Sequence, residues 1–317
     1  MPSRKLILRL SALFMAIVST SITAQEPNGV SRYMDVNAPG ALETDTYAVN
    51  NSGVIAGDFV DANDVQHGMI LNGKTLTTVD RQGCLTAPGP GAITLFGLTS
   101  KQVAVGWCFD TTVGTDVAFE YNHGRFTTLT FQGAVSIQAQ GINDLGQVVG
   151  AYLDEAGLQH GFRLAAGKLL TLDVPQHSAP TAWSINNKGL ISIYAVNSSG
   201  HYDSFLTSNG RTYNNVNVKI PGLVVTDSLI HGVNNPISTD AADRVYTYVD
   251  ASGQEHGALF VRGGYHSFND PKALTGTTRA FGVNDKLEII GDYAPASLGS
   301  PSAPPNQGFD AYGCCRH

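Results

Sequence analysis

Apolar positions recur in short runs along the chain, and residues 140–175 show the pattern most clearly. Within this stretch, pairs of apolar residues are separated by turn-forming Gly, Asn and Asp residues: Val148 and Val149, Phe162 and Leu164, Leu170 and Leu172. Short apolar runs bounded by turn residues are typical of antiparallel strands at close spacing. The stretch therefore predicts several short β-strands in succession.

Imperfect copies of this stretch fill most of the chain. Aligned on the first turn, the copies are marked by Asn50, Thr99, Asn143, Asn186, Asn234 and Asn284. The third apolar run of each copy is marked by Met69, Phe119, Phe162, Phe205, Ala258 and Phe309. Eleven residues after the first five of these stand Asp80, Thr130, Asp173, Val216 and Asn269. The interval of eleven residues is the same in these copies, whereas the distance from one copy to the next varies. Constant spacing indicates a packed unit, and variable spacing indicates surface loops, which tolerate insertion.

Each copy contains four predicted strands, the first of them rich in small residues. Tandem four-stranded units of about 40 to 50 residues are typical of a β-propeller, in which blades surround an axis. The predicted fold is therefore an all-β propeller with six four-stranded blades. Five or seven blades are the alternatives if a degenerate copy has been miscounted.

The sixth copy ends before its fourth strand, because eleven residues beyond Phe309 would fall past His317. The missing segment is present at the other end of the chain, where Tyr33 to Pro39 resembles the run that ends at Pro175. We therefore predict that residues 32–36 supply the fourth strand of the last blade. Joining the two ends removes the strand edges that an open array would expose.

The composition agrees with an all-β domain and disfavours some classes of binding partner. Hydrophobic residues make up 42% and charged residues 14% of the chain, and 35 glycines suit a chain that reverses direction often. The net charge of −7 and the lack of a Lys/Arg run after the first few residues predict no basic surface. Nucleic acid and anionic membranes are accordingly disfavoured as partners.

The first 24 residues differ from the rest of the chain in their pattern of charged and apolar residues. Arg4 and Lys5 precede an apolar run that ends near Val18, and small polar residues follow as far as Ala24. This is the pattern of a secretory signal peptide cleaved after Ala24. The run is shorter than the roughly 20 apolar residues of a membrane span. We expect a secreted or periplasmic protein with one propeller domain over residues 25–317.

Four cysteines follow the predicted cleavage site: Cys84, Cys108, Cys314 and Cys315. An even number in an exported protein favours disulfides, and a Cys84–Cys108 bond would hold the longest loop between blades. Cys314 and Cys315 are adjacent and could close only a strained ring. Reduced thiols, a bond to each other and a bond to another chain all stay open for this pair. A metal site in the same tail would lack a second pair of ligands at zinc spacing.

The repeat resembles the bacterial extracellular HAF repeats, which are named after a His-Ala-Phe tripeptide. The resemblance is carried by the segment from Gly141 to Gly150 and by His160, Gly161 and Phe162. It extends over about residues 33–313, although Gly replaces Ala in three copies and the Trp often found after the tripeptide is missing. The resemblance implies export and repeat architecture, and it transfers no catalytic residues.

Recurring polar residues are interpreted as structural. His67, His160 and His256 occupy equivalent positions in alternate copies, too far apart in a ring for one metal site, so hydrogen bonding is the expected role. Asp61, Asp110, Asp154 and Asp250 end the second strands and are expected to cap turns. No nucleophile elbow, zinc-protease motif or phosphate loop is present. No cofactor or metal is expected.

The longest insertions concentrate on one face of the predicted ring. They are residues 81–92, 217–226 and 294–306, which follow second or fourth strands. Long loops on one face of a rigid scaffold often form the binding site, although insertions also accumulate wherever a surface tolerates them. The candidate binding residues are Arg81, Gln82, Asn217, Lys219 and Asn306.

These observations favour an exported binding or scaffold module at the cell envelope, with a glycan or a protein as ligand. The alternative is a polysaccharide hydrolase or lyase whose carboxylates come from loops 81–92 and 294–306, since such enzymes use a pair of carboxylates about 5 to 10 Å apart. A third possibility is a surface-layer or matrix component. The oligomeric state stays open.

Overall fold

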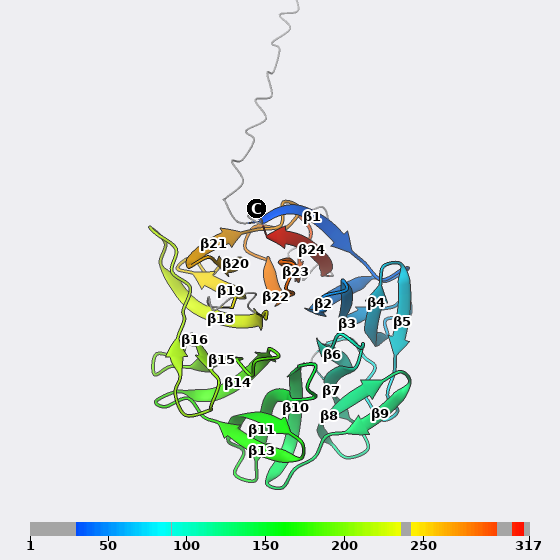
Figure 1. Ribbon diagram of the computed structural model, residues 1–317. Helices are drawn as coiled ribbons and strands as arrows, with labels where there is room; N and C mark the ends of the chain where they lie inside the picture. Colours follow the sequence, from blue (N-terminus) through cyan, green and yellow to red (C-terminus); the bar gives the residue numbers. More distant parts are fainter. Residues whose placement is uncertain (1–29, 90, 236–241, 297–305, 314–317) are drawn as a thin grey trace, which may run out of the picture.

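A computed structural model describes residues 30–89, 91–235, 242–296 and 306–313. Six antiparallel sheets of four strands each surround a central axis, as Figure 1 shows. The predicted six-bladed propeller is therefore confirmed. The predicted signal peptide, Cys314 and Cys315 lie outside the described residues, and so does most of loop 294–306.

Each blade runs outward from the axis in chain order. Blade 1 contains β2 (Glu43–Val49), β3 (Val54–Val60), β4 (Gln66–Asn72) and β5 (Thr75–Val79). Blade 2 contains β6 (Thr94–Leu98), β7 (Ala104–Asp110), β8 (Thr115–Asn122) and β9 (Arg125–Thr128). Blade 3 contains β10 (Ala134–Ile142), β11 (Val148–Asp154), β12 (Gln159–Ala165) and β13 (Lys168–Leu172).

The remaining blades follow the same plan, except that the outermost strand of blade 6 comes from the N-terminal part of the chain. Blade 4 contains β14 (Ser178–Ile185), β15 (Ile191–Val196), β16 (Tyr202–Thr207) and β17 (Asn214–Asn215). Blade 5 contains β18 (Val225–Val233), β19 (Arg244–Asp250), β20 (Glu255–Val261) and β21 (Gly264–Phe268). Blade 6 contains β22 (Arg279–Val283), β23 (Glu288–Tyr293), β24 (Gln307–Gly313) and β1 (Val30–Val36).

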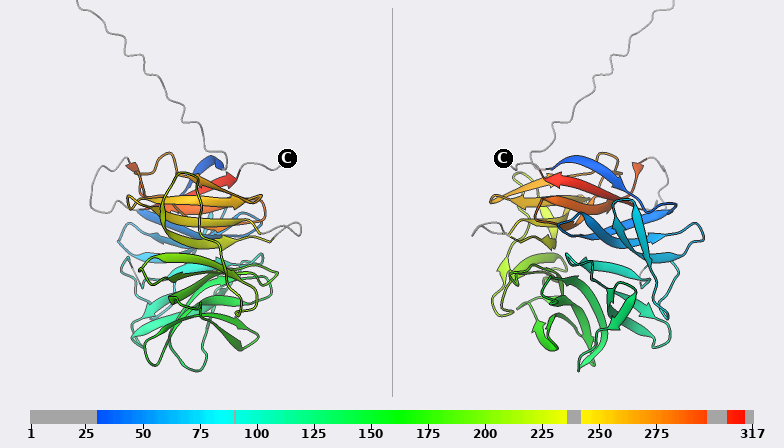
Figure 2. Two further views of the ribbon diagram at one scale, coloured as in Figure 1. Left: turned by 90° about the vertical axis from the view of Figure 1, so that its left-hand side faces the viewer. Right: turned by 45° about the vertical axis from the view of Figure 1, so that its right-hand side comes forward.

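The N-terminal strand closes the ring. β1 pairs antiparallel with β24, with Met34 opposite Asp310, and Figures 1 and 2 draw these two strands side by side. The predicted use of residues 32–36 as the outermost strand of the last blade is confirmed. Asp35 adds side-chain bonds to the same blade, because it accepts a hydrogen bond of 3.0 Å from the Tyr293 hydroxyl.

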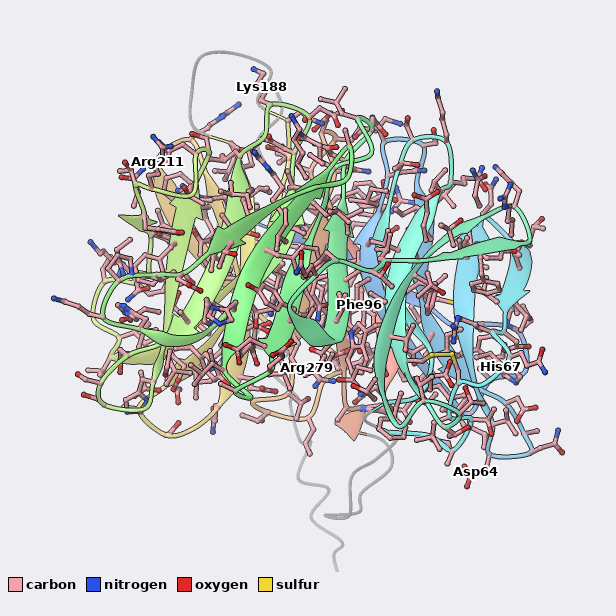
Figure 3. The ribbon with its side chains drawn as sticks, turned by 90° about the horizontal axis from the view of Figure 1, so that it is seen from below. Asp64, His67, Phe96, Lys188, Arg211 and Arg279 are labelled. Atoms are coloured by element: carbon pink, nitrogen blue, oxygen red, sulfur yellow. A yellow bond between two sulfur atoms is a disulfide. The ribbon has the colours of Figure 1, made fainter. Side chains whose placement is uncertain are left out.

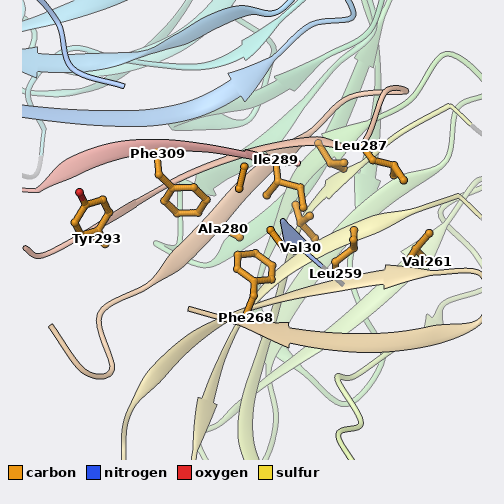
Figure 4. Packing of buried hydrophobic residues seen from close by; sticks show 12 residues of the cluster. Val30, Leu259, Val261, Phe268, Ala280, Leu287, Ile289, Tyr293 and Phe309 are labelled. Atoms are coloured by element: carbon orange, nitrogen blue, oxygen red, sulfur yellow. The ribbon is translucent and has the colours of Figure 1, made fainter. Parts of the chain in front are cut away.

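The core lies between neighbouring blades. In Figure 4, Val30, Phe309 and Phe268 from blades 5 and 6 belong to one buried cluster. The residues that mark the third strand of each copy are buried, with exposed fractions between 0% and 6%: Met69, Phe119, Phe162, Phe205, Ala258 and Phe309. These positions are therefore the packing centres of the blades, which explains why an apolar residue recurs in every copy.

Glycine in the middle of the second strand allows the first strand to approach closely. A Cβ atom on Gly57 would overlap the carbonyl oxygen of Asp45. The same holds in three further blades for Gly106, Gly150 and Gly291, which face the carbonyl oxygens of Thr94, Gln138 and Arg279. The recurring glycine of the repeat therefore has a steric cause.

Blade 6 contains a carboxyl group that titrates near neutrality. Asp310 on β24 is buried, and its pKa is raised to about 7 by burial and then by the nearby Glu288 carboxylate. Since the folded protein holds this proton more tightly than the unfolded chain, the stability it contributes is complete below a pH of about 4. That stability is lost as the pH rises through about 7.

We expect the melting temperature of the wild-type protein to fall between pH 5 and pH 8, by about 2 to 4 °C for each kcal/mol lost. Asp310→Asn should reduce this fall, because the amide stays neutral. Thermal melts of both proteins at the two pH values provide the measurement. The exposed Asp64 serves as the control through Asp64→Asn. Parallel pH profiles for wild type and Asp310→Asn would contradict the assignment.

Candidate functional site

The ring has two distinct faces. Turns between second and third strands and links between blades form the loop face, which includes Asp64. Turns between first and second strands and between third and fourth strands form the turn face, which includes Lys188 and Arg211. Figure 3 shows Asp64 and His67 toward one side of the disc and Lys188 and Arg211 at the opposite side.

The longest described loop, residues 81–89 and 91–92, lies on the loop face and is held in place. Cys84 and Cys108 form a disulfide, as predicted. Arg81 donates a hydrogen bond of 2.8 Å from Nη1 to Asp110 Oδ2. The pKa of Asp110 lies below its usual value because it accepts hydrogen bonds from Thr112 and then from Arg81. Arg81 thus stabilises the loop, while its neighbour Gln82 is exposed.

The other candidate residues of the loop face occupy separate blades. Asn217 binds Asp203 through Nδ2 at 2.6 Å and accepts the Ser204 backbone N–H. Lys219 is exposed, and the Asn306 carbonyl oxygen accepts the Thr44 backbone N–H at 3.1 Å. Among the described residues, no hydrogen bond joins the Arg81, Lys219 and Asn306 loops. A shared binding site on this face therefore stays a prediction.

The recurring histidines and aspartates have structural roles, as predicted. Nδ1 of the His in each of three blades bonds the residue after the fourth strand: His67 to Asp80, His160 to Asp173, and His256 to Asn269. The Asp that ends the second strand accepts backbone N–H groups of its own turn, as in Asp154. In the described part of the chain, no three His, Cys, Asp or Glu side chains are grouped so that they could hold a metal ion.

In blade 4, the hydrogen bond between the start of the third strand and the end of the fourth strand has its donor and acceptor exchanged. Asp203 stands where blades 1, 3 and 5 have His, and it accepts hydrogen bonds from Asn197 and Asn217. Donor and acceptor have been exchanged, while the link between the turn and the fourth strand is kept. The contact therefore fixes the edge of the blade, and the identity of its residues is secondary.

A funnel opens along the axis on the turn face, with a volume of about 120 Å³. A β-bulge at the same point of every first strand skips one residue in the pairing register. Such bulges redirect side chains. The skipped residues are Tyr47, Phe96, Gln140, Trp183, His231 and Phe281. All of these except His231 line the funnel.

The bulged aromatic residues form a continuous floor across the axis. Ring centroids of Tyr47 lie 4.6 Å from Phe96 and 4.9 Å from Phe281. Trp183 completes the layer at 5.6 Å from Phe96 and 5.9 Å from Phe281. His231 packs against Trp183 at 4.5 Å, and burial lowers its pKa to about 4, so the imidazole is neutral.

Gln140 is the one non-aromatic side chain among the six bulged residues. It is 5% exposed, and its Oε1 has no hydrogen-bond partner. A buried carbonyl oxygen without a partner costs free energy, and a bound donor would recover it. Gln140, which lines the funnel, therefore carries a buried acceptor without a partner, and a ligand reaches this oxygen only if the amide turns toward the funnel.

A belt of polar residues surrounds the mouth of the funnel. It consists of Asn51, Ser100, Asp144, Asn187, Asn235 and Asp285. Several of them link neighbouring blades, since the Asp144 backbone N–H donates to Asn187 Oδ1 and that of Asn187 donates to Asn235 Oδ1. Partial burial alone would raise the pKa of Asp144, but hydrogen bonds from Ser100 and Asn187 outweigh it, and the pKa is lowered.

Sequence reasoning missed the funnel because its signal depends on the alignment of the copies. The bulged residues all lie three positions before the first-turn residue of each copy, and five of the six are aromatic or His. The belt residues all lie one position after that first-turn residue. An alignment of the six copies that compared these two positions would have placed both sets of residues at the axis.

Two carboxylates meet on the loop-face side of the axis, at the seam between blades 6 and 1. Asp45 and Asp292 lie within hydrogen-bonding reach of each other, and Arg279 Nε donates to Asp292 Oδ1 at 2.7 Å. The pair arises from β2 and β23 instead of the loops expected for a hydrolase. Exposed fractions of 9% and 0% keep substrate away from both groups.

The prediction that the chain offers no basic surface is wrong for the turn face. Eight Lys and Arg residues of the described chain are exposed there: Lys74, Lys101, Arg125, Lys168, Lys188, Arg211, Arg262 and Lys286. Exposed acidic residues of the opposite face include Asp64, Glu155 and Asp173, while Asp144 is exposed on the turn face. Net charge sums over both faces and therefore conceals this separation.

No helix in the described part of the chain is long and apolar enough to cross a bilayer. No protein-family model matches the chain, and no curated protein matches it in sequence. The resemblance to the HAF repeats consequently stays a prediction.

Solved structures with the same fold exist, at low sequence identity. A mutant of the lectin of Aleuria aurantia in complex with Fucα1-6GlcNAc has a TM-score of 0.52 at 11% identity, covering 87% of this chain and 96% of the lectin. SapL1 lectin in complex with α-methyl fucoside has a TM-score of 0.55 at 11% identity, covering 88% and 96%. TolB from Acinetobacter baumannii has a TM-score of 0.53 at 10% identity, covering 82% of this chain and 63% of TolB. The chain thus shares the propeller fold with these proteins.

Proposed function

We propose that the protein is an exported carbohydrate-binding module and that the axial funnel is its binding site. The observation that carries the proposal is the unpartnered Gln140 Oε1 inside an otherwise aromatic floor. A sugar hydroxyl is a neutral donor of the right kind for this acceptor.

The lining of the funnel fits a polyhydroxylated ring. Phe96 and Tyr47 are partly exposed and offer flat apolar surfaces on which the C–H face of a sugar can pack. Asn51, Asn187 and Asn235 each engage part of their hydrogen-bonding capacity in the belt, and each amide nitrogen has two N–H groups. Apolar walls with a few placed polar groups are the usual composition of a small-ligand site.

Two further observations support the proposal. The signal-peptide pattern and the Cys84–Cys108 disulfide suit an oxidising compartment outside the cytoplasm. Among the proteins of similar fold, the lectins named above were solved with fucose-containing ligands. An envelope protein is the competing ligand, and it would require contacts beyond a funnel of about 120 Å³.

A glycan array probed with the mature protein tests the proposal, with turnover assayed on every hit. Gln140→Leu should lower affinity for the retained glycan about tenfold, because one hydrogen bond is lost, while the melting temperature stays unchanged or rises. Gln132→Leu, at an exposed position on the loop face, is the matched control and should bind normally. Retention of no glycan, or full affinity in Gln140→Leu, would refute the proposal.

A further inference from the structure

The turn face carries two rings of positive charge around the funnel. The outer ring stands at the hairpins between third and fourth strands of blades 1 to 5 and consists of Lys74, Arg125, Lys168, Arg211 and Arg262. The inner ring stands at the turns between first and second strands of blades 2, 4 and 6 and consists of Lys101, Lys188 and Lys286. Every blade therefore contributes at least one exposed cation to this face.

Two-residue hairpins hold four members of the outer ring, whereas Arg211 stands in a longer turn between Leu206 and Asn214. In blade 3, Ala165 pairs with Lys168 across a two-residue turn, and in blade 5, Val261 pairs with Gly264 in the same way. The first residue of each turn is left-handed, with φ of 47° at Ala166 and 52° at Arg262. Two-residue turns of this kind match the twist of the strands and hold the backbone in one conformation. The backbone positions of these four cations are therefore set by the hairpins.

The inner ring is tied to the belt. Each of its three lysines directly follows a belt residue: Ser100, Asn187 or Asp285. The belt residues are hydrogen-bonded between blades, as in the 2.7 Å bond from the Asn235 backbone N–H to Asp285 Oδ1. A ligand that reaches the funnel consequently passes between lysines whose backbone is anchored.

We propose that the ligand of the turn face is an acidic polysaccharide. One sugar unit occupies the funnel, and the carboxylate or sulfate groups of neighbouring units contact the two rings of cations. The inference rests on the proposed carbohydrate binding and specifies the class of glycan. Complementary charge of this kind accelerates association and selects partners, and its effect weakens with salt.

Charge spacing favours a polysaccharide over nucleic acid. Double-stranded DNA carries one charge for about every 1.7 Å of its length, which demands a dense run of cations. The turn face instead offers one or two cations per blade, separated by turn residues that can bind hydroxyl groups. Asp144 and Asp285 at the mouth of the funnel repel the anionic groups of either polymer, so the charged groups of the polysaccharide contact the cations around the mouth and not the mouth itself.

Polygalacturonate and its neutral methyl ester form a matched pair of probes. We expect the wild-type protein to bind the acid form about tenfold more tightly at 50 mM NaCl, and this preference should largely disappear at 500 mM NaCl. A variant with Lys168→Gln, Arg211→Gln and Arg262→Gln should lose the preference while it still binds the ester. Isothermal titration calorimetry gives both affinities.

The control variant changes the net charge equally on the other face. Val113→Glu, Leu158→Glu and Val224→Glu alter residues with exposed fractions of 63%, 60% and 66% on the loop face, and the charge falls by three in both variants. This control should keep the preference of the wild-type protein. Loss of the preference in both variants would assign it to overall charge and overturn the inference.

Further outcomes separate the inference from the proposed function. Equal binding of the acid form and the ester would overturn the inference and leave carbohydrate binding intact. Salt-sensitive binding of single-stranded DNA, or of phosphatidylcholine vesicles containing phosphatidylserine, without binding of either polysaccharide would overturn the inference. Retention of no glycan on the array would overturn the proposed function as well. The inference is supported if only the acid polysaccharide shows the preference and only the turn-face variant removes it.

Discussion

A mature protein that begins at Pro39 will melt at least about 10 °C below one that begins at Gln25, or it will aggregate. This shorter protein lacks β1, so β24 loses its outer partner along six paired positions. It also loses Val30 from the cluster between blades 5 and 6, and Asp35 from its bonds to Tyr293 and Lys272. Neighbouring blades share one closed core, so the loss should affect the whole ring.

Differential scanning calorimetry and light scattering of the two proteins provide the measurement. A synthetic peptide of residues 25–38 added in trans should restore part of the melting temperature, because an added strand can pair with the exposed edge of β24. Met34→Ala in the full-length mature protein alters a residue that is 37% exposed and should change melting little. Equal melting of the Pro39 and Gln25 proteins would mean that β1 does not hold the ring.

The fold could be predicted because each blade is formed by one continuous copy of the repeat. The missing strand followed from the number of residues that remain after Phe309. Phe309 marked a sixth unit without room for its last strand, and residues 32–36 matched the missing segment. Both inferences depend only on spacing along the chain, which strand pairing fixes. The roles of His67 and Asp154 followed for the same reason, since their partners lie in the same blade.

Features that depend on contacts between blades could not be predicted in this way. The funnel combines single residues, such as Gln140 and Trp183, that only a closed ring brings together. The basic face arises because the antiparallel path of each blade sends alternate turns to opposite faces, so Lys168 and Glu155 separate although they are close in sequence. Arg81 and Asn217 hold their own loops through bonds to Asp110 and Asp203, and a binding role for these long loops stays a prediction.

The pair Asp45 and Asp292, between blades 6 and 1, is another feature that depends on contact between blades and that only the structure reveals. Burial raises the pKa of both carboxyl groups, and for Asp45 the neighbouring Asp292 carboxylate raises it further. Arg279 opposes this effect at Asp292, to which it is bonded. We therefore expect Asp292 to be ionised at neutral pH and Asp45 to hold the proton and donate it to Asp292. This accounts for the lack of partners at Asp45 Oδ1 and Asp292 Oδ2, whose bonds require that proton.

Asp45→Asn and Asp292→Asn should consequently differ although both remove one carboxylate. At pH 7 Asp45→Asn should melt close to the wild-type protein, because an amide can donate to Asp292 as the protonated acid does. Asp292→Asn leaves the Arg279 guanidinium without its partner. Because the Arg279 side chain is 33% exposed, we expect a loss of about 2 kcal/mol, below the 3 to 5 kcal/mol typical of a fully buried pair. Such a loss lowers the melting temperature by about 5 °C. If Asp292→Asn melts like the wild-type protein while Asp45→Asn is destabilised, the proton resides on Asp292 and the assignment is reversed.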